Sequence, residues 1–300
     1  MITYFKNLED GKLRQVKDFV PGCWISVVDP SSYDIVLLSE KLSLDVEELE
    51  SGLDQNEIPR VDVYDGFTYI FTNAVLPDNT IITFLIVLGE QFILTLSKKS
   101  PSFLDKIADG RISFVTSEKT KCLVRILNAV NSDFEKSTIS TVKVIRSKKT
   151  RTNELKEKDL NILLEHEEFL NDLSSSYNQM KLMYERLRKR VVFPEAEAEE
   201  INDLILEAEE GVNLCLSYLK TISNIRNYTH ILLSNKLNRV ITILTVFTIL
   251  ISIPAAVSGF YGMNIRLPLQ ESPDAFLYVL GFVVLLWVVL AFYLKRKDVF

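Results

Sequence analysis

Histidine and cysteine are scarce in this chain, which carries two histidines and three cysteines among its 300 residues. The cysteines, Cys23, Cys122 and Cys215, stand far apart and form no Cys-x-x-Cys pair. A disulfide framework is therefore not expected, and free thiols suit a reducing compartment. Two histidines without paired cysteines also make a structural zinc site unexpected.

Motifs of nucleotide-binding and hydrolytic enzymes are missing as well. The chain has no glycine-rich phosphate loop, no Gly-x-Ser-x-Gly turn and no metalloprotease motif. We therefore expect a protein that is not an enzyme and uses no organic cofactor. The net charge of −6 argues against nucleic acid as a partner, because a phosphate backbone attracts basic surfaces.

Charge is absent from two long stretches, between Arg239 and Arg266 and between Asp274 and Lys295. Each stretch is long enough for a helix that crosses a hydrocarbon core of about 30 Å. Buried helices of a soluble protein are the alternative interpretation. Two such stretches favour two transmembrane helices, predicted at 240–260 and 275–294, with the lipid bilayer of the cell membrane as a partner.

Basic residues predict the orientation of these spans. Residues 1–16 contain no apolar core of a signal peptide, so no cleavable leader is expected. Lys236 and Arg239 precede the first span, and a basic tail, 295–300, follows the second. The positive-inside rule then puts both termini in the cytoplasm and the loop 261–274 outside the cell.

The chain before the spans divides into an α/β domain, 1–117, a helical region, 118–194, and a stalk helix, 195–239. Strand patterns, the last with a central Gly-Glu hairpin, occur in three segments, 23–29, 60–76 and 81–97. Between the first two segments, Ser43 is followed by acidic residues, which predicts a helix that Ser43 caps.

Apolar spacing predicts the packing of two long helices. The first has a seam at alternating spacings of three and four, formed by Leu170, Leu173, Tyr177, Met180, Tyr184, Leu187 and Val191. Phe193-Pro194 ends this helix. The next begins near Glu195, and its apolar positions include Leu204, Ile205, Ala208, Val212, Leu216, Leu219, Ile222 and Ile225. If it continues into the first span, it is about 60 residues long and couples the cytoplasmic domain to the membrane.

Small and polar residues form a stripe along the first span. Two series with a spacing of seven compose it, namely Asn238, Thr245, Ser252 and Gly259, and Ile241, Thr248 and Ala255. The stripe indicates either close helix packing with hydroxyls bonded back to the helix or the wall of a water-filled path. The second span is bulky and apolar throughout, so a pore would need several copies of the chain around a symmetry axis.

The first span ends in Tyr261-Gly262-Met263-Asn264, ahead of a short loop and the second span. In this position the four residues resemble the signature of the CorA family of magnesium transporters. The similarity extends to segments 59–71, 89–97 and 234–254. The resemblance implies an α+β cytoplasmic domain followed by long stalk helices and two C-terminal transmembrane helices, assembled as a funnel-shaped homopentamer.

The resemblance also implies a function. The chain would be a channel-type transporter that imports Mg²⁺ down its electrochemical gradient, with Co²⁺ and Ni²⁺ as further cargo. Mg²⁺ would also be regulatory, because cytoplasmic divalent cations would close the channel. A zinc-transporting relative of the same fold is one alternative, and a non-conducting membrane-tethered coiled-coil scaffold or sensor is another.

Residue roles follow from the same resemblance by position. Asn264 would be the selectivity filter, with Gly262 and Met263 shaping its loop, and the stripe from Asn238 to Gly259 would line the pore. The two glycines, Gly259 and Gly262, would permit close backbone approach and unusual φ values. The alternative for Asn264 is an ordinary helix C-cap.

Two parts of the sequence depart from the family pattern. Asp78 matches a sensor aspartate, but its stalk counterpart is the neutral Asn227, although Asp203 is another stalk acid that fits by position. In the external loop, Arg266 occupies a region where an acidic residue beside a proline is common in the family. The loop acids Glu271 and Asp274 would then attract cations instead.

Overall fold

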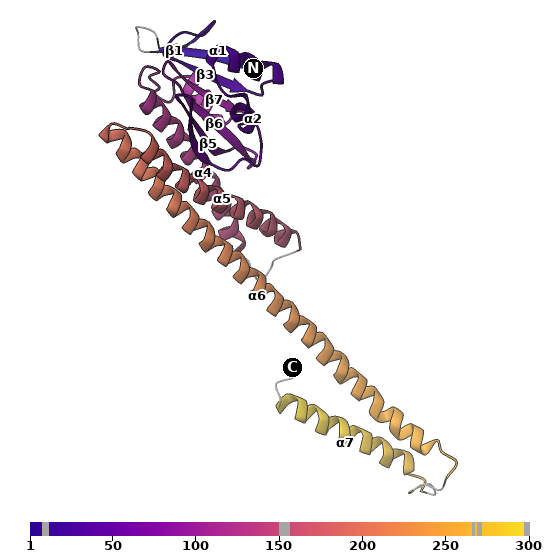
Figure 1. Ribbon diagram of the computed structural model, residues 1–300. Coiled ribbons are helices and arrows are strands. Elements are labelled where there is room, and N and C mark those ends of the chain that lie inside the picture. The colour runs from indigo at the N-terminus through magenta and orange to yellow at the C-terminus, as the bar shows by residue number, and fades with distance from the viewer. Residues whose placement is uncertain (8–11, 150–156, 266–267, 269–271, 297–300) are drawn as a thin grey trace. The chain divides into compact units, whose positions relative to one another are not determined.

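The computed structural model describes residues 1–7, 12–149, 157–265, 268 and 272–296. Glu271 and Arg266, two residues of the predicted external loop, lie outside these ranges, as do residues 297–300 of the predicted tail. The chain divides into two compact units, Met1–Arg226 and Asn227–Phe300. Figure 1 shows their helices and strands, and each unit is described by itself.

The first unit contains a seven-stranded mixed sheet. Its strands are β1 (Ile2–Asn7), β2 (Leu13–Val16), β3 (Cys23–Val28), β4 (Arg60–Tyr64), β5 (Phe67–Val75), β6 (Ile81–Leu88) and β7 (Phe92–Ser97), in the order β2-β1-β3-β7-β6-β5-β4. Only the pair β3 and β7 is parallel among the described strands. The three predicted strand segments and the hairpin between β6 and β7 are confirmed.

Both faces of this sheet are buried, and successive residues of a strand point alternately to one face and the other. On β3, Trp24 joins a core with helices α3 (Ser102–Ala108), α4 (Lys119–Lys149) and α5 (Glu157–Arg190). Its neighbour Ile25 faces the other core, which α1 (Ser32–Leu42) and α2 (Val46–Ser51) cover (Figure 1). Two covered faces explain why the central strands read as nearly continuous apolar runs.

The predicted cap of the helix after Ser43 is wrong. Helix α2 begins at Val46, and the side chain of Asp45 accepts hydrogen bonds from the backbone N–H groups of Glu47 and Glu48 at 2.8 and 3.3 Å. Ser43 instead ends α1, in a left-handed conformation with φ of 57°. The carboxylate of Asp45 satisfies two N–H groups at the start of the helix, and its negative charge is stabilised by the positive end of the helix dipole.

Helices α4, α5 and the beginning of α6 (Glu195–Tyr261) extend the first core into a helical bundle. The predicted seam on α5 is confirmed, because its first six residues are at most 2% exposed and Val191 packs against the same core. On α6 the apolar positions noted in the sequence are buried or half-buried except Leu216, which is 53% exposed. Its neighbour Cys215 is fully buried instead.

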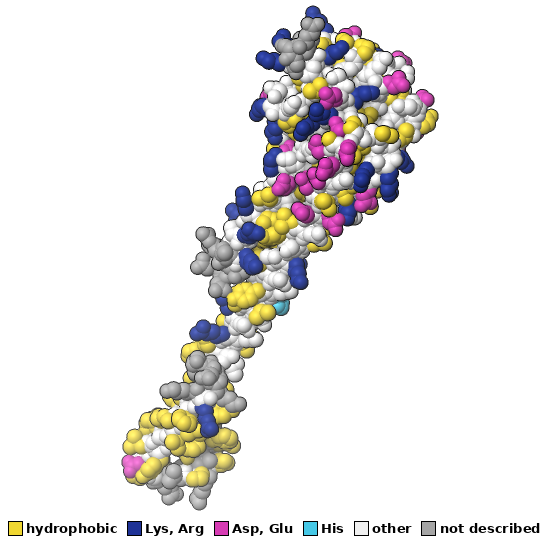
Figure 2. All heavy atoms as spheres, turned by 90° about the vertical axis from the view of Figure 1, so that its left-hand side faces the viewer, with side chains coloured by type: hydrophobic (Ala, Val, Ile, Leu, Met, Phe, Trp, Pro, Cys, Tyr) yellow, Lys and Arg dark blue, Asp and Glu magenta, His cyan; other side chains and the backbone are white. Residues whose placement is uncertain are grey.

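The second unit contains the rest of α6 and helix α7 (Ala275–Arg296). The two are long and apolar enough to cross a membrane, and they match the two predicted spans. Helix α6 continues unbroken to Tyr261 and is 67 residues long, so the predicted stalk and first span are one helix. Figure 2 shows hydrophobic side chains spread over the surface of these helices.

Candidate functional site

The predicted stripe on α6 lies away from α7. Val246, 8% exposed, and the half-buried Leu250 lie one turn apart on the side of α6 that α7 covers. At about 100° per residue, the stripe runs roughly 140° around the helix from that side. All seven of its residues are exposed in the single chain: Asn238, Ile241, Thr245, Thr248, Ser252, Ala255 and Gly259. The stripe therefore takes no part in packing between the two spans.

Each hydroxyl of the stripe bonds back to its own helix. Thr245 donates to the carbonyl of Ile241 at 2.8 Å, Thr248 to that of Leu244 at 2.9 Å, and Ser252 to that of Thr248 at 2.7 Å. Back-bonding uses the hydroxyl proton and leaves the oxygen as an acceptor that faces outward. The stripe thus presents oxygen acceptors, which suit the water shell of a cation better than an anion.

The residues of the predicted filter follow the last turn of α6. The N–H of Gly262 donates to Ser258 at 2.9 Å, and that of Met263 donates to Phe260 at 3.2 Å. Because α6 ends at Tyr261, the cap position belongs to Gly262, and Asn264 lies two residues beyond it. The alternative of Asn264 as a helix cap therefore does not fit, and its side chain is exposed.

The expected unusual φ values at the two glycines are wrong. Neither Gly259 nor Gly262 has a positive φ. Gly259 lies inside α6, where an added Cβ would meet no atom within 4 Å. At Gly262 a Cβ would lie 3.3 Å from the carbonyl oxygen of Ser258, which is a tight contact. Within the single chain, close backbone approach therefore explains Gly262 but not Gly259.

Asp274 stands directly before α7. Its carbonyl accepts hydrogen bonds from the N–H groups of Leu277 and Tyr278 at 3.0 and 3.2 Å, and its side chain is exposed. An acidic residue in this position stabilises the start of a helix. Asp274 therefore has a structural role beside its predicted part as a cation-attracting loop acid.

Two of the three predicted regulatory residues lie on α6, and the third lies in a turn of the sheet. Asp78 lies in the turn between β5 and β6, where its carboxylate accepts a hydrogen bond from the N–H of Thr80 at 3.0 Å. This hydrogen bond lowers the pKa of Asp78. Asp203 is exposed on α6 within the first unit, and Asn227 is the exposed first residue of the second. In the part of the chain that the structure describes, no three His, Cys, Asp or Glu side chains are grouped to hold a metal ion.

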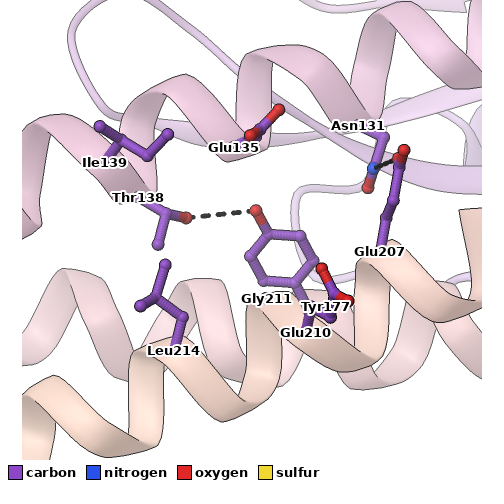
Figure 3. A pocket seen from close by; sticks show the side chains of 9 residues that line it. All are labelled: Asn131, Glu135, Thr138, Ile139, Tyr177, Glu207, Glu210, Gly211 and Leu214. Carbon is purple, nitrogen blue, oxygen red and sulfur yellow. Dashed lines mark hydrogen bonds between the residues drawn. The ribbon is translucent and has the colours of Figure 1, made fainter.

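A pocket between α4, α5 and α6 was not predicted from the sequence. It has a volume of about 240 Å³, and three of its lining residues, Glu135, Glu207 and Glu210, carry carboxylates (Figure 3). Asn131, which is 4% exposed, donates from its amide nitrogen to Glu207. Burial raises the pKa of Glu207; this hydrogen bond opposes the rise, and nearby negative charge adds to it. The sequence gives no sign of this pocket, because Glu135 lies on α4 and is far along the chain from Glu207 and Glu210 on α6.

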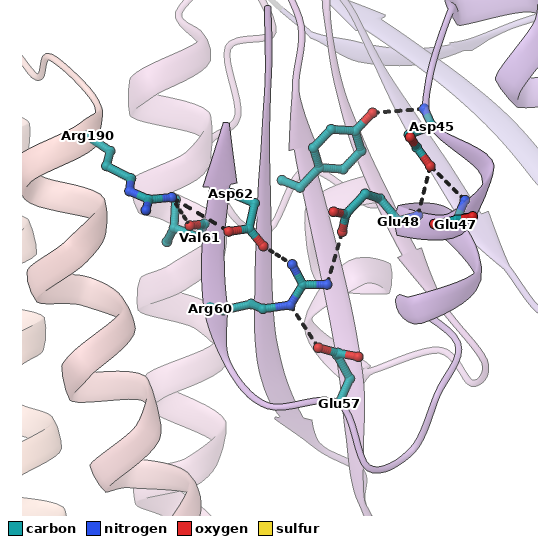
Figure 4. A network of polar contacts seen from close by, with 9 residues as sticks. Asp45, Glu47, Glu48, Glu57, Arg60, Val61, Asp62 and Arg190 are labelled. Carbon is teal, nitrogen blue, oxygen red and sulfur yellow. Dashed lines mark hydrogen bonds and ion pairs between the residues drawn. The ribbon is translucent and has the colours of Figure 1, made fainter. Parts of the chain in front are cut away.

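A second charged cluster, at the sheet edge, consists of ion pairs within the protein. Arg60 contacts the carboxylates of Glu48 at 3.0 Å and Glu57 at 2.8 Å and also pairs with Asp62 (Figure 4). Arg190 of α5 reaches Asp62 at 3.6 Å and donates to the carbonyl of Val61. The network fastens α5 to the edge strand β4, and each of its three carboxylates contacts an arginine, so it is structural.

Sequence comparison gives two matches that cover nearly the whole chain. Residues 22–296 match the protein family described as CorA-like Mg²⁺ transporter protein. The chain is also 25% identical, over 326 aligned residues and 99% of each chain, to the cobalt/magnesium transport protein CorA of Methanocaldococcus jannaschii.

Solved structures of similar fold are available for comparison. The complete structure of the magnesium transporter CorA from M. jannaschii superposes with a TM-score of 0.88 at 20% identity, covering 99% of this chain and 98% of that one. The full-length CmaX protein gives a TM-score of 0.76 at 13% identity, with 97% of each chain covered. The cytoplasmic domain of ZntB from Vibrio parahaemolyticus gives 0.65 at 10% identity and covers 78% of this chain and 98% of that one. These likenesses show the fold, including the predicted long helix and two C-terminal spans.

Proposed function

The chain belongs to the family of CorA-like Mg²⁺ transporter proteins, and from that membership we propose that it is a channel that passes Mg²⁺ across the cell membrane. Members of this family are divalent-cation transporters rather than enzymes, as expected from the missing catalytic motifs. The observation that carries the proposal is the stripe of outward-facing oxygens on α6, which leads to the exposed amide of Asn264.

The chemistry of the stripe suits a hydrated cation. Mg²⁺ loses its waters reluctantly and requires nearly ideal octahedral oxygen geometry. The hydroxyls of Thr245, Thr248 and Ser252 have committed their protons to the helix, so their oxygens accept hydrogen bonds from the water shell. The carboxamide oxygens of Asn264 and Asn238 act in the same way at the two ends of the stripe. Neutral acceptors bind weakly enough for release, which conduction requires.

We assign the chain a homopentameric assembly with α6 around the pore and α7 outside. One chain cannot enclose a path, because its stripe is exposed while α7 covers the side with Val246 and Leu250. Copies related by a rotation axis would turn their stripes toward that axis. Both termini would lie in the cytoplasm and the loop 261–274 outside, following the basic residues at the ends of the spans.

The direction and control of transport follow from the same arrangement. At 100 mV, inside negative, entry of two charges gains about 4.6 kcal/mol, so inward flow of Mg²⁺ requires no nucleotide. Cytoplasmic Mg²⁺ would close the channel by binding between subunits, with Asp78 and Asp203 as ligands. Asn227 has no charge, so we expect it to supply at most a carboxamide oxygen. Co²⁺ and Ni²⁺ are further expected cargo.

Uptake into liposomes that contain the purified full chain tests this proposal. An indicator of Mg²⁺ inside the vesicles should report entry that rises when the interior is made negative, with empty liposomes as the control. Zn²⁺ flux without Mg²⁺ flux would favour a zinc transporter instead. The absence of flux for every divalent ion, from protein that elutes as a defined oligomer, would favour a scaffold and contradict the proposal.

A further inference from the structure

Pro254 lies inside helix α6, in the outer half of the predicted first span. Proline has no backbone N–H, so the carbonyl of Leu250, four residues earlier, loses its donor within the helix. The helix nevertheless continues to Tyr261. An unpaired carbonyl is unfavourable in hydrocarbon, and prolines in membrane helices are tolerated where a neighbouring group replaces the missing donor.

Hydroxyls of the same helix do not serve this carbonyl. Thr248 donates to Leu244, and Ser252 donates to Thr248, so both protons near the proline are committed elsewhere. The donor comes from the other span. The indole Nε1 of Trp287 in α7 lies 3.1 Å from the carbonyl oxygen of Leu250 and donates to it.

The two residues match in depth as well as in chemistry. Leu250 lies eleven residues before the end of α6, and Trp287 lies twelve residues after the start of α7. At 1.5 Å per residue these positions are about 16 and 18 Å from the connecting loop. Val246 lies one turn before Leu250 and Val283 one turn before Trp287; among the described residues of the second unit they are the most buried apolar ones, at 8% and 7% exposure. The hydrogen bond therefore forms one turn away from the well-buried valine of each helix.

The position of Trp287 in α7 is itself unusual. Tryptophan and tyrosine normally gather at the membrane surfaces, where their polar atoms meet water. Tyr278 and Tyr293 fit that rule, because they lie near the two ends of α7. Trp287 lies well inside the span, where its N–H would have no partner in lipid. The carbonyl that Pro254 releases supplies this partner.

We propose that Trp287 is a positioning residue that replaces the backbone donor lost at Pro254 and so fixes the course of the pore helix toward its outer end. The segment after Pro254 runs for two turns to Tyr261 and carries Gly262, Met263 and Asn264. Proline is a common cause of a bend in a helix. A bend pinned by α7 would hold this segment in one direction, and this part of the inference rests on the proposed function.

A double-mutant cycle on the full chain tests the inference. Trp287→Phe keeps a ring but removes the donor, and Pro254→Ala returns a backbone N–H to Leu250. Trp287→Phe alone should shift the unfolding equilibrium in detergent by about fivefold, as expected for one net hydrogen bond, and it should slow Mg²⁺ uptake. In the Pro254→Ala background the same substitution should have little effect on either quantity.

The other tryptophan is a matched control. Trp24 of the first unit donates from Nε1 to Thr95 at 3.0 Å and has no connection with the spans. Trp24→Phe should therefore destabilise the wild type and the Pro254→Ala variant equally. If Trp287→Phe prevents assembly, recovery of the oligomer by added Pro254→Ala supports the same conclusion.

Equal effects of Trp287→Phe in both backgrounds would overturn the inference, as would failure of Pro254→Ala to restore a lost assembly. A wild-type protein that passes no Mg²⁺ would contradict the proposed function alone. The stability cycle would still decide whether Trp287 serves the carbonyl of Leu250.

Discussion

Gly211 of α6 faces the ring of Tyr177 on α5 so closely that a Cβ at this glycine would lie 2.6 Å from the ring's Cζ atom. The ring cannot move away freely. It is 2% exposed, its hydroxyl contacts that of Thr138 at 3.2 Å, and it packs edge-on against Phe134. Gly211 is therefore what lets α5 and α6 approach at this point.

We expect Gly211→Ala to lower the free energy of unfolding by about 1–3 kcal/mol, the usual cost of overpacking a core. Chemical denaturation measures this effect. Asn213→Ala, at an exposed position of the same helix, is the control and should change stability little. An alanine at 211 that is neutral or stabilising would show that the two helices separate easily.

The carboxylate of Glu207 predicts a pH dependence. Burial raises the pKa of Glu207 in the folded protein. At pH values just above the ordinary pKa of a carboxyl group, the folded state therefore binds more protons than the unfolded state. The stability that Glu207 contributes therefore falls as pH rises through that interval. Glu207→Gln can keep the hydrogen bond from Asn131, so in metal-free buffer it should be more stable than wild type at pH 7. This difference should disappear below about pH 4.

Glu209 offers the control for that measurement. Its carboxylate pairs with Lys181 at 2.8 Å, so Glu209→Gln loses an ion pair and should not stabilise the protein. A gain in stability at pH 7 for both variants would mean that general charge repulsion along α6 is responsible. A loss for Glu207→Gln would contradict the raised pKa of this carboxyl.

The three thiols should resist modification in the folded protein. Cys23, Cys122 and Cys215 are each at most 1% exposed. Burial raises the pKa of all three thiols, to about 12 for Cys122 and about 11 for Cys215. Because the thiolate is the reactive form, maleimide at pH 7 should label none of them until denaturant is added. Rapid labelling of the native protein would show that the first unit opens locally.

The stripe on α6 predicts a difference between two threonines. Thr245→Val removes an outward-facing oxygen from the proposed pore wall, so Mg²⁺ flux should fall several-fold while the oligomer remains intact. Thr242, half-buried one turn before the buried Val246, lies on the side toward α7. Thr242→Val should therefore leave flux nearly unchanged. Equal effects of the two substitutions would contradict the placement of the stripe at the pore.

Much of the fold can be predicted because each element carries its own pattern. The seam on α5 is periodic over many residues, and each predicted span is a long stretch without charge; the structure has a helix at each of these places. Strands β1 and β2 are not predicted because their sequences, ITYFKN and LRQV, do not alternate apolar and polar residues. In the structure all six residues of β1 are half-buried. Serine caps helices well, which makes Ser43 a plausible cap in the sequence, but Asp45 stands directly before the helix.

Patterns in the sequence do not predict which side chains of different elements come into contact. The stripe on α6 can be seen because it repeats along one helix. The pairing of Trp287 with Leu250, and of Asn131 with Glu207, joins positions on different helices, and nothing in the local sequence marks them as neighbours. Leu216 and Cys215 are adjacent and point about 100° apart on the helix, and only the orientation of α6 against its neighbours decides that Cys215 is the buried one.

Mg²⁺ uptake into liposomes by the wild type and by Asn264→Ala, with Ile265→Ala as the neighbouring control, examines the proposed pore and its filter together. Both residues are exposed beyond the end of α6, so neither substitution should disturb folding. We expect Asn264→Ala to abolish or strongly reduce Mg²⁺ entry while the oligomer forms normally and Ile265→Ala still transports. Undiminished Mg²⁺ flux through assembled Asn264→Ala would contradict the assignment of this amide as the filter.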